Sequence, residues 1–138
     1  MIEKDIGENL TIYEQACSKC IDDLYHTACL ALVDTDAAEK LVAEICVAGV
    51  HKYDHLEDEA EIRLRLAFDL YHRVKRRLLF CTPNTEALPA QLQVLTKQER
   101  LVIAMRFSAG LSAEDSGRIL GLTQSEYCRT INEIVGKI

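Results

Sequence analysis

The apolar residues of this 138-residue chain recur three and four positions apart along most of its length. Positions with this spacing share one face of an α-helix, so the pattern predicts helices rather than strands. Three long and three short segments have this pattern. We expect helices over about residues 12–33, 37–52, 59–80, 97–109, 113–120 and 124–136. The fold class predicted from the pattern is therefore all-α.

Each of the three long helices has an apolar stripe, which predicts the face that it buries. The stripes are formed by Ile21, Leu24, Tyr25, Ala28 and Leu32 in the first helix, Leu41, Val42, Ile45 and Cys46 in the second, and Ile62, Leu66, Leu70, Val74 and Leu78 in the third. Polar residues mark where helices begin. Residues 34–36 (Asp-Thr-Asp) precede the second helix, and Thr96 with Glu99 forms a capping-box pattern before the fourth.

The stretch from residue 81 to residue 94 contains both prolines of the chain and is the best candidate for a linker. It separates the three long helices from the three short ones. We therefore expect two all-α domains, an N-terminal one over residues 1–80 and a C-terminal one over residues 95–138.

Composition narrows the class of protein. Two Pro and six Gly leave little material for the many turns of an all-β fold. No apolar stretch reaches the roughly 18 residues that cross a bilayer. Residues 1–8 (MIEKDIGE) are acidic and lack the basic-then-apolar order of a signal peptide. We expect a cytoplasmic protein that has no membrane partner.

Charge is unevenly distributed. The chain has a formal net charge of −6, yet residues 62–77 contain six basic side chains and a single acidic one. Binding to nucleic acid depends on the local field, so an overall acidic protein can still hold DNA at such a segment. The alternative is structural, because cations near the carboxyl end of a helix also stabilise the helix dipole.

The sequence contains few residue patterns that would indicate a metal site or a catalytic site. Cys17, Cys20, His26 and Cys29 are the residue types of a zinc site. However, they lie in one uninterrupted helix, in which Cys17 and Cys29 are roughly 18 Å apart at about 1.5 Å per residue. Free thiols, no metal and no cofactor are therefore expected. The chain also lacks a Gly-rich phosphate loop, a nucleophile elbow and a His-Glu-x-x-His pattern, so we do not expect an enzyme.

The segment from Ser112 to Tyr127 has the pattern of a helix-turn-helix. Gly117 is small where two helices must cross closely, and Gly121 suits a turn with positive φ. Thr123 is a suitable N-cap for the second helix. Such a unit normally lays its second helix in the major groove of DNA. A simple αα-hairpin uses the same glycine and apolar spacing and remains the alternative.

The helix before this segment strengthens the DNA-binding interpretation. Residues 95–112 resemble region four of the bacterial sigma factors, in which an "LPxxERxVxxLRyxxGLS" pattern leads into the same hairpin. The matching positions are Leu95, Glu99, Arg100, Val102, Arg106, Phe107, Gly110, Leu111 and Ser112.

The N-terminal half is similar to region two of the same family. An "LYxxAxxxxxD"-like pattern is formed by Leu24, Tyr25, Ala28 and Asp34, and a "DAEDLVQExF"-like pattern by Ala38, Glu39, Leu41, Val42, Glu44 and Ile45. Together the two resemblances cover roughly residues 12–80 and 95–138. Their order is that of the two-domain extracytoplasmic-function group of sigma factors.

The resemblance implies a function in transcription initiation and a set of contact residues. Core RNA polymerase and promoter DNA are the implied partners, and an anti-sigma or other regulatory protein is a further one. Polymerase contacts are implied for Glu39, Leu41, Val42 and Glu44. DNA contacts are implied for Arg73, Lys75, Arg76 and Arg77 at phosphates, and for Thr123, Gln124, Ser125, Glu126 and Arg129 at the recognition helix.

The chain also departs from the family pattern. Ile62, Phe68 and Asp69 stand where the family carries a Trp and an Arg-Asn pair. The last helix, strongly basic in the family, carries Arg129 and Lys137 against two glutamates here. These departures leave a second interpretation open, in which the chain is a degenerate sigma-like interaction module that regulates transcription without reading promoter DNA.

Overall fold

The computed structural model describes residues 10–138, and all regular elements in this part of the chain are helices. They are α2 (Ile12–Leu32), α3 (Thr35–Lys52), α4 (Glu59–Leu78), α5 (Ala90–Gln93), α6 (Lys97–Phe107), α7 (Ala113–Leu120) and α8 (Gln124–Val135). The predicted all-α class is confirmed for these residues. Residues 1–9, which include the acidic start and part of the expected N-terminal domain, lie outside the described residues.

Side chains adjacent to the helices explain where several of them begin. The Asp34 carboxylate accepts a hydrogen bond from the Ala37 N–H at 3.0 Å, and that of Asp58 from the Ala60 N–H at 2.9 Å. Thr96 and Glu99 form both hydrogen bonds of a capping box before α6. Each cap satisfies amide groups that have no partner within the helix. The predicted starts therefore agree with the structure to within two residues.

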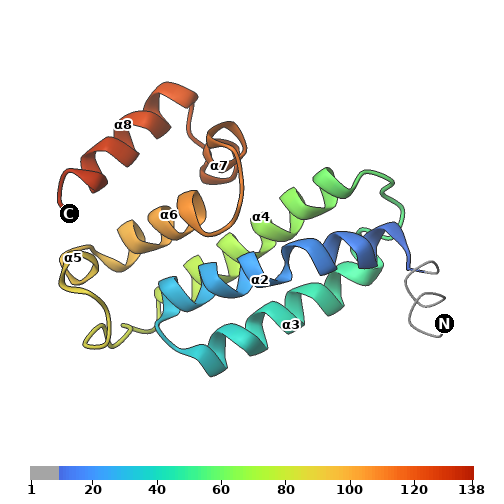
Figure 1. Cartoon of the computed structure of the whole chain (residues 1–138), viewed down its shortest axis with the longest axis horizontal. Helices are drawn as coiled ribbons and strands as arrows, with labels where there is room; N and C mark the ends of the chain where they lie inside the picture. The colour runs from blue at the N-terminus through green and yellow to red at the C-terminus, as the bar shows by residue number, and fades with distance from the viewer. Residues whose placement is uncertain (1–9) are drawn as a thin grey trace.

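The three long helices, α2, α3 and α4, pack against one another to form most of the core (Figure 1). The whole predicted stripe of α4 is buried. On α2 the prediction was wrong at Ile21, which is 41% exposed. The buried residues of α2 include Ala16, Cys20, Leu24 and Ala28, and the helix packs against α3, α4 and α6.

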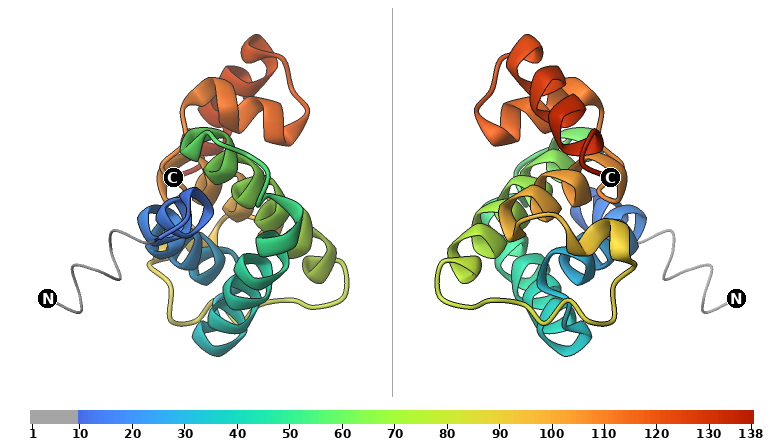
Figure 2. Two further views of the ribbon diagram at one scale, coloured as in Figure 1. Left: turned by 90° about the vertical axis from the view of Figure 1, so that its right-hand side faces the viewer. Right: turned by 90° about the vertical axis from the view of Figure 1, so that its left-hand side faces the viewer.

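The C-terminal helices rest on the long ones through α6, which packs against both α2 and α4. Leu101, Met105 and Ala109 share one buried cluster with the N-terminal helices. A second, smaller cluster under α8 contains Leu95, Ile103 and Ile134. Because α6 lies between the long helices and α8, α8 is at one edge of the molecule and α3 is at the opposite edge (Figure 2).

Residues 81–94 connect α4 to α6 around the outside of the molecule and include the single turn α5 (Figure 1). Lys97 at the start of α6 reaches back to this segment, where its ammonium donates a hydrogen bond to the Cys81 carbonyl at 3.2 Å.

Candidate functional site

The four basic side chains at the carboxyl end of α4 all reach solvent. Arg73, Lys75, Arg76 and Arg77 are exposed. Arg73 donates a hydrogen bond from Nη2 to Glu44 Oε2 at 2.7 Å, which forms an ion pair between α4 and α3. Among the described residues, the other three have no carboxylate partner within ion-pair distance. Their positive charge is therefore available to an anionic group of a ligand.

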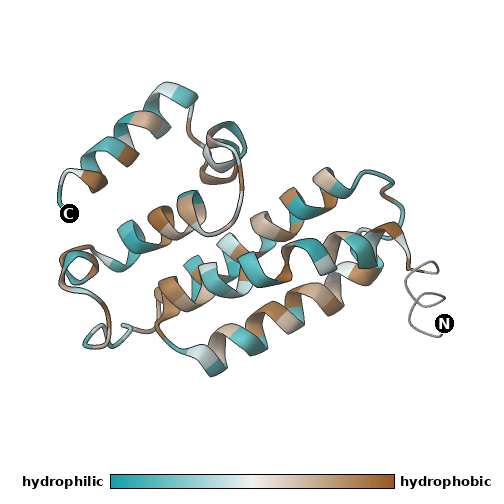
Figure 3. Cartoon of the chain, viewed as in Figure 1, coloured by the Kyte–Doolittle hydropathy of each residue, from teal (hydrophilic) through white to brown (hydrophobic). Residues whose placement is uncertain are grey.

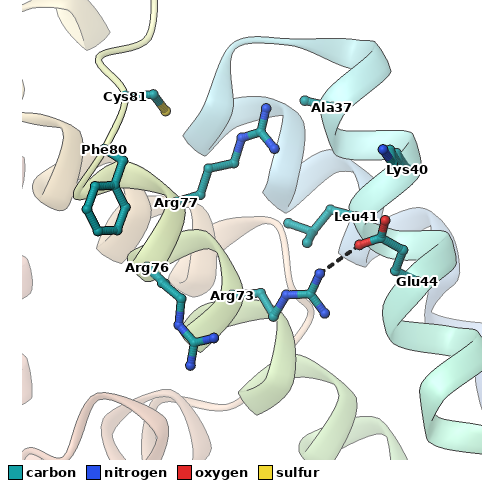
Figure 4. A pocket seen from close by; sticks show the side chains of 9 residues that line it. All are labelled: Ala37, Lys40, Leu41, Glu44, Arg73, Arg76, Arg77, Phe80 and Cys81. Atoms are coloured by element: carbon teal, nitrogen blue, oxygen red, sulfur yellow. Dashed lines mark hydrogen bonds and ion pairs between the residues drawn. The ribbon is translucent and has the colours of Figure 1, made fainter.

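A cavity of about 430 Å³ lies between α3 and this end of α4 (Figure 4). Its lining consists of Ala37, Lys40, Leu41, Glu44, Arg73, Arg76, Arg77, Phe80 and Cys81. Four of these side chains are cations and one is a carboxylate. The three guanidinium groups point in different directions rather than toward a common point. This arrangement suits contacts spread along an extended anion better than the binding of one compact anion.

The cavity joins two sets of residues that the sequence assigned to different partners. Arg73, Arg76 and Arg77 were expected at DNA, and Leu41 and Glu44 at polymerase, yet all five line the same space. The structure thus places the carboxyl end of α4 beside the first half of α3. No pattern in the sequence indicates this, since the segments are about thirty residues apart.

Of the four α3 residues expected to contact polymerase, Glu39 and Glu44 are exposed. Leu41 and Val42 are only 6% and 3% exposed and belong to the main core. These two side chains stabilise the packing of the long helices and do not form the outer surface of α3.

The outer face of α3 is instead an apolar strip that the sequence interpretation missed. Ala43, Val47 and Val50 lie on the side of the helix opposite the buried Leu41 and Ile45. Val47 is 71% exposed, and Figure 3 shows how much of α3 is apolar. Helical phase could have revealed the strip, because positions 43, 47 and 50 share one face once positions 41 and 45 are assigned to the core.

The α7 and α8 helices have the geometry expected of a helix-turn-helix. Gly121 ends α7 with φ 73°, in the left-handed region that favours glycine. A Cβ atom at Gly117 would lie 3.4 Å from the Cβ of Tyr127, an ordinary van der Waals contact, so α8 lies close to α7 here but alanine would also fit. Tyr127 is buried and lies beside Gly117 of α7, while Ile119 belongs to the main core cluster that includes the long helices. A DNA-reading unit and a simple αα-hairpin share this geometry.

Some side chains at the start of α8 are hydrogen-bonded to the backbone of the helix, and others have no such bond. The Thr123 hydroxyl accepts a hydrogen bond from the Glu126 N–H, and the Glu126 carboxylate accepts one from the Thr123 N–H, each at 3.2 Å. Hydrogen bonding from Thr123, aided by the nearby positive charge of Arg129, lowers the pKa of Glu126. Thr123 and Glu126 therefore hold the start of α8, while Gln124, Ser125 and Arg129 are exposed and free to reach a ligand.

The cysteines do not assemble a metal site in the part of the chain that the structure describes. Cys17, Cys20 and Cys29 lie on α2, which is continuous over its length. All six cysteines are free thiols. Residues 10–138 contain no group of three or more His, Cys, Asp or Glu side chains that could hold a metal ion.

None of the helices within residues 10–138 combines the length and the apolar character needed to cross a membrane. Comparison with known protein families, curated proteins and solved structures found no match to this chain. A function can therefore be inferred only from its residues and their geometry.

Proposed function

We propose that this chain is a divergent sigma-like transcription factor that binds core RNA polymerase and promoter DNA. The observation that carries the proposal is the α7–turn–α8 unit, in which the first turn of α8 is exposed to solvent. A helix presented in this way can enter the major groove with its amino-terminal residues against the bases. The sigma-like order of motifs along the sequence supports the same conclusion. The chain acts in this proposal by binding, in the cytoplasm, and not by catalysis.

In the proposed complex, Gln124, Ser125 and Arg129 approach the base edges. Their amide, hydroxyl and guanidinium groups are the kinds of donors and acceptors that read bases in the major groove. Thr123 and Glu126 act mainly by fixing the start of α8, since each is already hydrogen-bonded to the other. Arg129 is the one basic side chain on this part of α8, so it supplies the strongest single base contact.

The basic end of α4 supplies phosphate contacts. Lys75, Arg76 and Arg77 are exposed, and no carboxylate in the described residues neutralises them. The divergent directions of the guanidinium groups suit a backbone whose phosphates are spaced along a strand (Figure 4). Contacts of this kind position a protein on DNA but do not specify a sequence.

Polymerase binding is assigned to the outer face of α3. Ala43, Val47 and Val50 offer an exposed apolar strip. The charged side chains of Glu39, Lys40 and Glu44 on the same helix are exposed, and Glu44 is paired with Arg73. An apolar centre with a polar rim is the usual composition of a protein–protein interface. The α3 face and the first turn of α8 lie at opposite edges of the molecule (Figure 1), whereas the basic end of α4 lies beside the first half of α3.

One observation favours a second function, that of an interaction module which no longer reads promoter DNA. Glu126 is exposed in the turn of α8 that would meet the bases, and its carboxylate is negatively charged at neutral pH. Negative charge at this position repels DNA phosphates. In this alternative, the α3 face retains its partner and α8 does not bind DNA.

Two binding measurements separate these functions. The first is the affinity of the full chain for purified core polymerase of its own organism, compared between wild type, Val47→Glu and Val94→Glu. Both valines are largely exposed, but Val94 lies outside α3. We expect Val47→Glu to weaken binding and Val94→Glu to leave it unchanged. Equal binding by all three proteins would refute the assignment of the α3 face.

The second measurement is the affinity for promoter-sized duplex DNA. Arg129→Ala should weaken specific binding by roughly 1–3 kcal/mol, the usual range for a bidentate base contact. Glu126→Gln should strengthen it modestly, because glutamine still fits the capping box while the negative charge is lost. Polymerase binding without any DNA binding would favour the interaction module. Absence of both would contradict both functions.

A further inference from the structure

One side of α3 is left uncovered by the other described helices. Lys40 and the three residues of the apolar strip, Ala43, Val47 and Val50, are exposed there. The four residues follow one another at intervals of three, four and three positions, which aligns them along one side of the helix, as in the seam of a coiled coil. Because α3 lies at an edge of the molecule (Figure 1), this side is accessible to a partner.

The apolar strip continues into a cavity near the carboxyl end of α3. The cavity has a volume of about 510 Å³ and lies between the start of α2 and the loop that follows α3. Val50 lines it together with the apolar side chains of Ile12 and Leu56. Three carboxylates and a single histidine also line it, and the carboxylates belong to Glu14, Asp54 and Glu57. The lining therefore offers both apolar contacts and negative charge.

The other end of the strip has the opposite charge. Lys40 is exposed, and no carboxylate of the described residues lies within ion-pair distance of it. Glu44, one turn further along α3, is already paired with Arg73. Lys40 lies seven residues before Val47, and Asp54 lies seven residues after it. A cation and a group of carboxylates are thus placed at similar distances on the two sides of Val47.

We propose that two copies of this chain associate through this face of α3, with the two helices antiparallel and a two-fold axis near Val47. A two-fold contact uses the same surface of both copies, so that surface has to complement itself. The antiparallel arrangement brings Lys40 of each copy to the acidic cavity of the other. A parallel arrangement would instead set Lys40 against Lys40, which costs free energy because like charges repel.

The chemistry of a lysine side chain fits the cavity. Its aliphatic stem can pack against apolar groups such as Ile12, Val50 and Leu56 while its ammonium group stays beside the carboxylates. Each dimer contains this contact twice, once on each side of the axis. Between the two contacts, the valines of the apolar strips are removed from water, which supplies the favourable hydrophobic term.

The dimer is independent of the DNA and polymerase functions proposed above, because it requires neither partner. It does use the face of α3 that was assigned to polymerase. One copy cannot hold both partners on the same face, so the dimer and the polymerase complex exclude each other. A contact made by a single helix from each copy is small, and we therefore expect a dimer that dissociates on dilution.

The first test is sedimentation equilibrium of the full chain under reducing conditions, without polymerase or DNA. The series should run from about 1 µM to about 1 mM, the range of dissociation constants that correspond to weak association. Wild type should show a monomer–dimer equilibrium. Val47→Glu places two carboxylates near the axis and should weaken the dimer by about tenfold or more.

The matched control is Val94→Glu, which adds the same charge at an exposed valine outside α3. It should dimerise like wild type. A wild-type chain that stays monomeric over the whole range would overturn the proposal, whatever the outcome of the polymerase and DNA measurements. A dimer that both variants weaken equally, or that neither variant weakens, would overturn it as well.

A charge reversal tests the antiparallel arrangement. Lys40→Glu is one variant, and Asp54→Lys combined with Glu57→Lys is the other. Each alone brings like charges together at both contacts of a dimer and should weaken it by about tenfold or more. In an equimolar mixture, the new carboxylate of the first variant meets the new ammonium groups of the second, while the unchanged Lys40 of the second meets the unchanged carboxylates of the first.

The mixture should therefore form heterodimers, which sedimentation detects when one variant has a fluorescent label. Recovery of dimers also shows that both variants are folded. A mixture that stays as monomeric as its two components would overturn the antiparallel dimer. Dimerisation of Lys40→Glu alone with the affinity of wild type would do the same, because it would show that Lys40 does not meet the acidic cavity.

Discussion

Replacing Lys75, Arg76 and Arg77 together with Gln should flatten the salt dependence of DNA binding. These side chains are exposed, and within the described residues each lacks an ion pair, so each is free to neutralise one phosphate. Each phosphate neutralised on duplex DNA contributes about 0.9 to the slope of log K against log salt. Loss of three such contacts should therefore reduce the slope by up to about 2.7.

Arg73 should contribute less than its three neighbours. Its guanidinium is already paired with Glu44 at 2.7 Å, so binding a phosphate would require it to leave that carboxylate. We expect Arg73→Gln alone to change the slope by clearly less than about 0.9. Glu44→Gln should have the opposite effect and steepen the slope, because it frees the Arg73 charge.

Fluorescence anisotropy of a labelled duplex over a series of salt concentrations gives these slopes directly. A charge-matched control replaces Lys19, Lys52 and Arg65 with Gln, since each of them is paired with a carboxylate on its own or a neighbouring helix. This variant removes the same net charge but no proposed contact. A triple variant at residues 75–77 that retains the wild-type slope, or a control that loses as much, would refute the phosphate assignment.

Three further predictions concern stability. Leu41→Asp should lower the free energy of unfolding, measured by urea titration, by about 2–5 kcal/mol or more, because it removes a buried leucine and buries a charge. Val47→Asp, on the exposed side of the same helix, should change the free energy of unfolding by less than about 0.5 kcal/mol. Gly121→Ala should cost roughly 1–2 kcal/mol, visible as a lower melting temperature, since φ 73° is strained for a residue with a Cβ. The hydrogen bond from Lys137 is the main reason that the pKa of Glu99 is lowered. The contribution of ionised Glu99 to the free energy of unfolding should therefore be complete above the unfolded pKa of about 4.3 and should be lost as the pH falls through the lower folded pKa. Glu99→Gln should remove this part of the pH dependence of stability.

Much of the local structure could be predicted from the sequence because its causes lie within one or two helical turns. Asp34 accepts a hydrogen bond from an amide three residues ahead, and Thr96 and Thr123 do the same. The stripe from Ile62 to Leu78 repeats every four residues along α4, so its burial could be read from spacing alone. Gly121 was predicted at the turn because only a residue without a side chain adopts positive φ at little cost.

The tertiary structure decided which of several apolar faces is covered and which distant side chains meet. The sequence placed Ile21 inside, whereas packing exposes it. Leu41 is buried, as the apolar stripe of its helix predicted, so little of it is left for the partner contact that the resemblance implied. No pattern in the sequence indicated that Glu44 would pair with Arg73. A helix has the same periodicity whichever neighbour covers it, and Glu44 and Arg73 are about thirty residues apart in the sequence. Local patterns therefore determined the helices, while only the packing of α2, α3, α4 and α6 determined the surfaces and the ion pair on which the proposed function depends.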